Sequence, residues 1–134
     1  MSTRSPLAER IRFLGQLPQS QLAHHMVEAS VLVIPSLSEG LGRVIFEAMA
    51  CGTPVIGSRV GGIPELITDT VTGFLVPPGD ESALANKILW ILNNPIKTRE
   101  MGVRAREFAE NFFSSEIYVQ QYIRLLEFAK LQED

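Results

Sequence analysis

Short β-branched runs alternate with amphipathic stretches along this chain. Residues 31–34 form a continuous apolar run that Pro35 ends, and further short runs follow at 55–57 and 73–76. A strand without polar alternation is expected where both faces of its sheet are covered. Strands of this kind that alternate with helical periodicity are typical of βα units, so the sequence predicts a parallel α/β sheet with flanking helices.

Local signals predict where the helices begin and end. Asp80 is a suitable N-cap because its carboxylate accepts the unpaired N–H groups of a first turn. Gly61 and Gly62 precede a short helix that has Pro64 near its first turn. A short strand is expected at 11–14, ending at Gly15. The expected helices cover 18–28, 42–49, a short stretch after Gly62, 80–93, 96–110 and 115–131. The apolar residues with helical spacing on the first and fourth of these are Leu22, Met26, Val27, Leu84, Ile88 and either Ile91 or Leu92.

Length and composition indicate one soluble domain. The 134 residues suit a single domain at 1–134, with a core at about 10–94 and C-terminal helices at about 96–131. The net charge of −3 favours no nucleic acid partner. The single cysteine, Cys51, excludes an intrachain disulfide and is interpreted as a small buried hydrophobe. No run suits a transmembrane segment or a signal peptide, so we expect a cytoplasmic protein.

The segment between the strand at 31–34 and the following helix is where an open parallel sheet binds ligands. Gly40 and Gly42 let backbone N–H groups approach a ligand closely, and the helix N-terminus adds unpaired donors and positive partial charge. An anion such as phosphate suits this turn. A tight turn without a ligand explains the same glycines, and both interpretations remain open.

Two carboxylates bracket the turn. Glu39 lies in the loop, and Glu47 lies about 7 Å along the helix axis from Gly42. A carboxylate at that distance from a bound phosphate can accept hydrogen bonds from a ribose diol. Glu39, on the other side of the turn, can accept them from sugar hydroxyls. Spacing alone is weak support, but Glu47 lies among apolar residues, where an unpaired carboxylate is costly.

At these residues the chain resembles a known family. EGLGRVIFE has the form of the E-x7-E motif of retaining glycosyltransferases with the GT-B fold, the glycosyl transferase group 1 family. FLGQLP, VGGIPELI, GFLVPPGD, MGVRAREF and NFFSS follow in the order and spacing of that family, so the resemblance covers about residues 10–130. It implies the C-terminal, Rossmann-like half of a GT-B fold that lacks its first βα unit.

The resemblance also implies a role for each motif residue. Glu47 would bind the donor ribose, and Glu39 would be the catalytic-site residue that contacts the transferred sugar. Backbone N–H groups of Gly40, Leu41 and Gly42 would bind the diphosphate. The base would lie near residues 13–15, and the glycines at 61 and 62 would face the cleft or simply make a turn.

Several family features are absent or would lie upstream of Met1. These are the acceptor domain with its histidine and the Arg/Lys pair that neutralises the diphosphate. Arg43 is expected to point to solvent, although it could partly replace that pair, and His24 and His25 are expected at the surface. A small NAD-binding protein is disfavoured because no G-x-G-x-x-G follows a strand.

We therefore predict that the chain binds a nucleotide diphosphate sugar, the donor in a sugar transfer. In that reaction the sugar passes to an acceptor hydroxyl and keeps its anomeric configuration. Transfer would require an acceptor domain, supplied as a separate partner, and neither a cofactor nor a metal is expected. The alternative is a non-catalytic binding or interaction module. An apolar stripe in the last predicted helix indicates a homo-oligomer; it consists of Tyr118, Tyr122, Leu125, Leu126 and Ala129.

Overall fold

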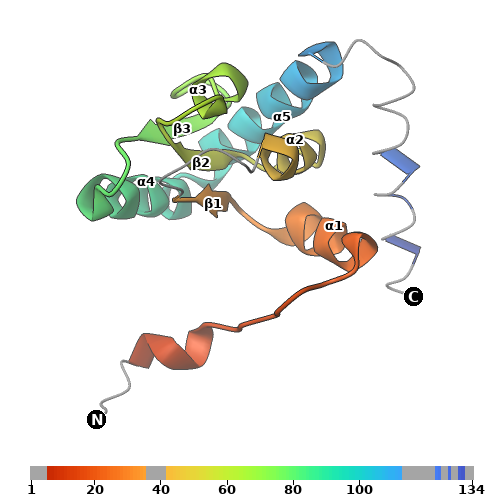
Figure 1. Ribbon diagram of the computed structural model, residues 1–134, viewed down its shortest axis with the longest axis horizontal. Coiled ribbons are helices and arrows are strands. Elements are labelled where there is room, and N and C mark those ends of the chain that lie inside the picture. Colours follow the sequence, from red (N-terminus) through yellow and green to blue (C-terminus); the bar gives the residue numbers. More distant parts are fainter. Residues whose placement is uncertain (1–5, 36–41, 113–122, 125–126, 128–129, 132–134) are drawn as a thin grey trace.

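The fold is a small parallel sheet with helices on both faces (Figure 1). The computed structural model describes residues 6–35, 42–112, 123–124, 127 and 130–131. In chain order the elements are η1 (Pro6–Arg10), α1 (Gln19–Glu28), β1 (Leu32–Ile34), α2 (Gly42–Ala50), β2 (Val55–Ser58), α3 (Ile63–Leu66), β3 (Gly73–Val76), α4 (Glu81–Asn93) and α5 (Pro95–Phe112).

The three described strands lie in the order β1-β2-β3, and both pairings are parallel. Ile34 pairs with Gly57, and Gly57 pairs with Leu75, so these three positions form one row across the sheet. Parallel neighbours require crossover connections, and α2 and α3 lie in the two crossovers. The predicted parallel α/β sheet is confirmed.

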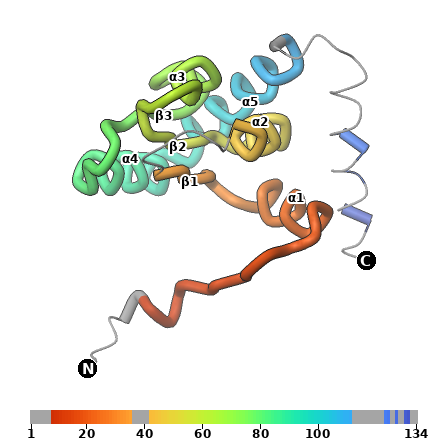
Figure 2. Tube along the Cα trace, in the orientation of Figure 1, coloured from red at the N-terminus to blue at the C-terminus, as the bar shows by residue number. Residues whose placement is uncertain are grey.

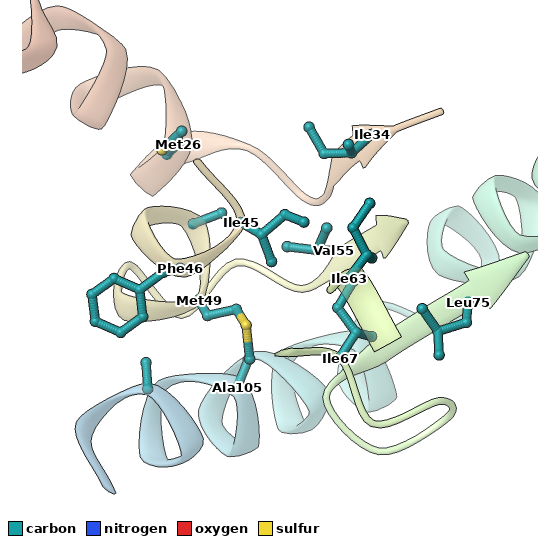
Figure 3. Packing of buried hydrophobic residues seen from close by; sticks show 12 residues of the cluster. Met26, Ile34, Ile45, Phe46, Met49, Val55, Ile63, Ile67, Leu75 and Ala105 are labelled. Carbon is teal, nitrogen blue, oxygen red and sulfur yellow. The ribbon is translucent and has the colours of Figure 1, made fainter. Parts of the chain in front are cut away.

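Each face of the sheet has its own apolar cluster. On one face Ile34, Val55 and Leu75 pack with residues of α1, α2, α3 and α5 (Figure 3). On the other face Ile56, Phe74 and Val76 pack with Ile91 of α4 and with Met101 of α5. All four residues of β2 and of β3 are buried, because helices cover both faces.

The predicted limits of the helices before residue 113 agree closely with the structure. The Asp80 carboxylate accepts a hydrogen bond from the backbone N of Ala83, at 3.0 Å, and caps α4 as expected. The sequence left open whether Ile91 or Leu92 faces inward on this helix. Ile91 is 2% exposed whereas Leu92 is 61% exposed, so Ile91 is the inward-facing residue. The cap and the apolar spacing are local signals, so they could be recognised without the tertiary fold.

The predicted strand at 11–14 is wrong. These residues have no strand structure, and Ile11, Phe13 and Leu14 are exposed. In Figure 2 the chain before α1 extends away from the sheet. A strand is stable only when its backbone pairs with a neighbour and its side chains pack, and in the described structure this segment does neither.

The predicted helix at 115–131 lies mostly outside the described residues, and so do the five residues of its apolar stripe. Residues 123–124, 127 and 130–131 within it are helical. In the described part of the chain, no helix is both long and apolar enough to cross a membrane.

Candidate functional site

The carboxyl ends of β1, β2 and β3 meet at one edge of the sheet, where open parallel sheets bind ligands. A hollow of about 250 Å³ lies there and reaches the start of α4. Its lining residues are Pro35, Ser58, Val76, Pro77, Gly79, Asp80, Glu81 and Leu84. A larger hollow of about 390 Å³ lies between the end of α1 and the corner joining α4 to α5, away from this edge. We favour the smaller hollow as part of a ligand site because of its place in the sheet.

Glu47 is a buried carboxylate on α2, with 8% of the residue exposed. Its Oε1 accepts a hydrogen bond from Gln19 Nε2 at 2.7 Å and another from Arg43 Nε at 3.1 Å. The carboxylate therefore has polar partners despite its apolar surroundings. The bond from Gln19 also joins α2 to the first residue of α1.

The expectation that Arg43 points to solvent is only half right. Its side chain is 67% exposed, but its Nε forms an ion pair with Glu47 one helical turn away. Much of the charge of this arginine is thus directed at a carboxylate of the same helix. Arg43 is consequently a weaker candidate for neutralising a diphosphate than a cation without an acidic partner.

Gln19 is the residue of this cluster that the sequence did not reveal. It lies 28 positions before Glu47, at the start of α1, in a stretch with three glutamines. Nothing in that stretch distinguishes Gln19 from its neighbours. The contact arises only because the start of α1 lies beside the middle of α2.

The three predicted site glycines that the structure describes differ in what their positions require. Gly61 has a φ of +52°, a left-handed conformation that favours glycine, so the turn itself explains this residue. Gly42 is the first residue of α2, and a Cβ there would lie 3.5 Å from Leu66 Cδ1, an ordinary contact. The fold therefore leaves room for a side chain at position 42. Gly62 has a φ of −85° at the start of α3 and needs no special conformation.

The remaining predicted site residues are described only in part. Glu39, Gly40 and Leu41 lie outside the described residues. Phe13, predicted near the base, is 95% exposed, and Gly15 has a φ of +66°. The chain before α1 thus presents an uncovered aromatic ring close in sequence to Gln19.

Cys51 lies just after α2 and is partly buried. Burial, together with the negative charge of Glu47, raises the pKa of its thiol to about 12. A thiol with such a pKa stays protonated at neutral pH, so the interpretation of Cys51 as an unreactive residue is supported. Among the described residues, no group of three or more His, Cys, Asp or Glu is placed to hold a metal ion.

Comparison with known proteins identifies the family. The sequence model of the glycosyl transferases group 1 matches residues 2–108. The chain belongs to this family. It is 40% identical over 116 residues to the N-acetyl-alpha-D-glucosaminyl L-malate synthase of Bacillus anthracis, covering 87% of the chain and 30% of that protein. It is 41% identical over 112 residues to the D-inositol 3-phosphate glycosyltransferase of Streptomyces scabiei, covering 84% and 25%.

Solved structures support the same assignment. A sucrose-phosphate synthase from Thermosynechococcus elongatus superposes with a TM-score of 0.78 at 43% identity, covering 90% of this chain and 30% of that one. The HepE protein of Anabaena, in complex with UDP and glucose, gives a TM-score of 0.75 at 35% identity, covering 88% and 32%. The expected fold class, a Rossmann-like α/β sheet of the GT-B type, is confirmed. The chain spans at most about a third of the length of these relatives.

Proposed function

We propose that this chain binds the donor of a sugar transfer, a nucleotide diphosphate sugar. The observation that supports this most directly is the buried Glu47 carboxylate of α2, which accepts hydrogen bonds from Gln19 and Arg43, in a chain that belongs to a family of glycosyltransferases. The similar HepE protein is known in complexes with UDP, with UDP-glucose, and with UDP and glucose. These ligands combine a ribose, a diphosphate and a sugar, which the proposed residues match one by one.

In this proposal Glu47 accepts hydrogen bonds from the ribose diol. The diphosphate lies at the N-terminus of α2, where Gly42 and the preceding residues Gly40 and Leu41 supply backbone N–H groups. Glu39 contacts hydroxyl groups of the transferred sugar. As the bond from the anomeric carbon to the diphosphate breaks, negative charge develops on the diphosphate, and the N–H groups stabilise it. The sugar keeps its anomeric configuration, and no metal or cofactor takes part.

A panel of UDP-, GDP- and ADP-sugars titrated into the ¹⁵N-labelled chain tests donor binding. We expect one nucleotide to shift amide signals of α2 and of residues 13–19, with a weak Kd on the order of 0.1–1 mM, because Arg43 is already paired with Glu47. Shifts confined to the hollow between the end of α1 and the α4–α5 corner would contradict the site assignment.

The complete transfer requires an acceptor domain, so we expect the chain alone to transfer no sugar. A radiolabelled donor, incubated with the purified chain and with candidate acceptors, checks this expectation. Robust turnover by the 134 residues alone would refute it. No nucleotide binding in the panel would instead favour the alternative, a binding or interaction module derived from a transferase.

A further inference from the structure

The larger hollow, of about 390 Å³, lies at the amino-terminal edge of the sheet, opposite the edge proposed for the donor. Ser30, just before β1, and Pro54, just before β2, line it together with Leu92 of α4 and Arg99 of α5. Its volume falls within the range of roughly 300–1,000 Å³ that is typical of small-molecule sites. The hollow is therefore large enough for a small ligand and is separate from the donor site.

Arg99 brings a positive charge to this hollow. Arg43, Arg59 and Arg106 each form an ion pair with a carboxylate, whereas Arg99 forms none within the part of the chain that the structure describes. Glu100, its neighbour in sequence, does not line the hollow. The guanidinium group of Arg99 thus keeps its N–H donors for a ligand, and their fork geometry matches two oxygens of one anionic group.

Two hydroxyl groups also line the hollow, and they differ in what they can do. Thr98 Oγ1 donates to the backbone oxygen of Ile91 at 3.2 Å, so its single proton is used at the corner between α4 and α5. Ser30 is exposed, and its hydroxyl has no hydrogen bond to another described residue. Ser30 can consequently donate to a ligand. Two uncommitted donors, from segments far apart in the sequence, face the same hollow.

We propose that this hollow binds a small organic anion whose charged group is a phosphate or a carboxylate. Arg99 holds that group with paired N–H bonds, and Ser30 donates a further one. Leu92, Pro54 and Pro95 offer apolar surface to the organic part of the ligand. The chain has a net charge of −3 and does not attract anions in general, so recognition depends on these local donors. The two hollows share no lining residue, so the inference is independent of the proposed function.

The test is an NMR titration of the ¹⁵N-labelled chain with phenyl phosphate and with benzoate. These probes share an aromatic ring and differ in the charged group. We expect amide signals of residues 29–30, 91–92 and 96–99 to shift, while those of α2 stay unchanged. Tighter binding of either probe supports the site and identifies its charged group. Inorganic phosphate, which lacks the ring, should bind about tenfold more weakly, and phenol, which lacks the anionic group, should shift none of these signals.

Two matched variants separate recognition by Arg99 from a general effect of charge. Arg99→Met keeps a long unbranched side chain and removes the guanidinium group, so it should weaken phenyl phosphate about tenfold. Arg106→Met removes the same charge from the same helix, at a residue that does not line the hollow, and should change the affinity less than about twofold. Ser30→Ala should weaken binding about threefold, because one exposed donor is lost.

Equal weakening by Arg99→Met and Arg106→Met would show general charge attraction and would overturn the inference. Shifts confined to α2, or no shift around the hollow with any anion up to about 10 mM, would overturn it as well. Arg99 and Arg106 are both exposed, so both variants should fold, and urea unfolding checks this. Failure of the proposed function is detected separately, by the nucleotide panel and by Glu47→Ala.

Discussion

Gly52 and Gly102 meet backbone to backbone where α5 passes the turn that leads into β2. A Cβ on Gly102 would overlap the carbonyl oxygen of Gly52 and would lie 3.5 Å from Pro54 Cδ. Gly52 itself has a φ of +78°. The absence of a side chain on Gly102 therefore sets how closely α5 packs against the rest of the domain.

The first prediction concerns this contact. Gly102→Ala should lower the free energy of unfolding by about 1–3 kcal/mol, because the new methyl group meets rigid backbone and α5 must move outward. The better helix propensity of alanine offsets at most about 1 kcal/mol of this loss. Urea unfolding followed by circular dichroism measures the change. Val103→Ala, at the next and exposed position of α5, is the control and should change stability by less than about 0.5 kcal/mol. Equal stability of both variants would show that α5 adjusts without cost.

The second prediction concerns Cys51. Because the pKa of its thiol is raised to about 12, the thiolate fraction at pH 8 should be roughly a thousandfold below that of an ordinary thiol. Reaction with a thiol-specific disulfide reagent should be correspondingly slow in the native chain and fast in urea. Glu47→Gln removes one of the causes of the raised pKa and should speed the reaction in the native chain.

The same shift makes stability depend on alkaline pH. The folded chain keeps the thiol protonated, whereas the unfolded chain releases its proton near pH 9.0. The contribution of Cys51 to stability is therefore fully present below pH 9.0 and is lost as the pH rises toward 12. Cys51→Ala should lose less stability over this range than the wild-type chain. Parallel pH profiles for the two proteins would contradict the raised pKa.

The third prediction concerns donor binding. Glu47→Ala should weaken the binding of the nucleotide identified by the donor panel by about 1–3 kcal/mol, because charge-assisted hydrogen bonds to the ribose are lost. Isothermal titration or NMR measures the affinity. Glu28→Ala, an exposed glutamate at the end of α1, is the control and should bind as the wild type does. Tight, sub-micromolar binding that is unchanged by Glu47→Ala would exclude the ribose site.

The fourth prediction concerns self-association. The stripe first proposed for it lies outside the described residues, but Ile11, Phe13 and Leu14 are exposed in the segment before α1. Apolar side chains gathered in one exposed segment favour contact with another molecule. We expect concentration-dependent dimers in sedimentation velocity, and Phe13→Ser should weaken them. Arg12→Ser, at the neighbouring exposed position, should not. A monomer at high micromolar concentration would refute the prediction.

The sequence by itself determined the local elements of this protein. The Asp80 cap, the apolar spacing of α4 and the apolar runs of β1, β2 and β3 all depend on neighbours a few residues away, so they could be recognised in order along the chain. The parallel topology followed from the alternation of these elements. The apolar neighbours of Glu47 along the chain also singled it out as a carboxylate that needs partners.

Only the tertiary structure decided which partners those are. Gln19 reaches Glu47 across 28 positions, and Gly102 meets Gly52 across 50, and neither contact has a local signal. Residues 11–14 have a strand-like pattern but form no strand, because pairing depends on what lies beside the segment. Periodicity reports which side of an element is apolar, whereas a hydrogen bond or a backbone contact depends on the placement of two elements to within about an ångström. That placement is a property of the packed domain and not of either segment.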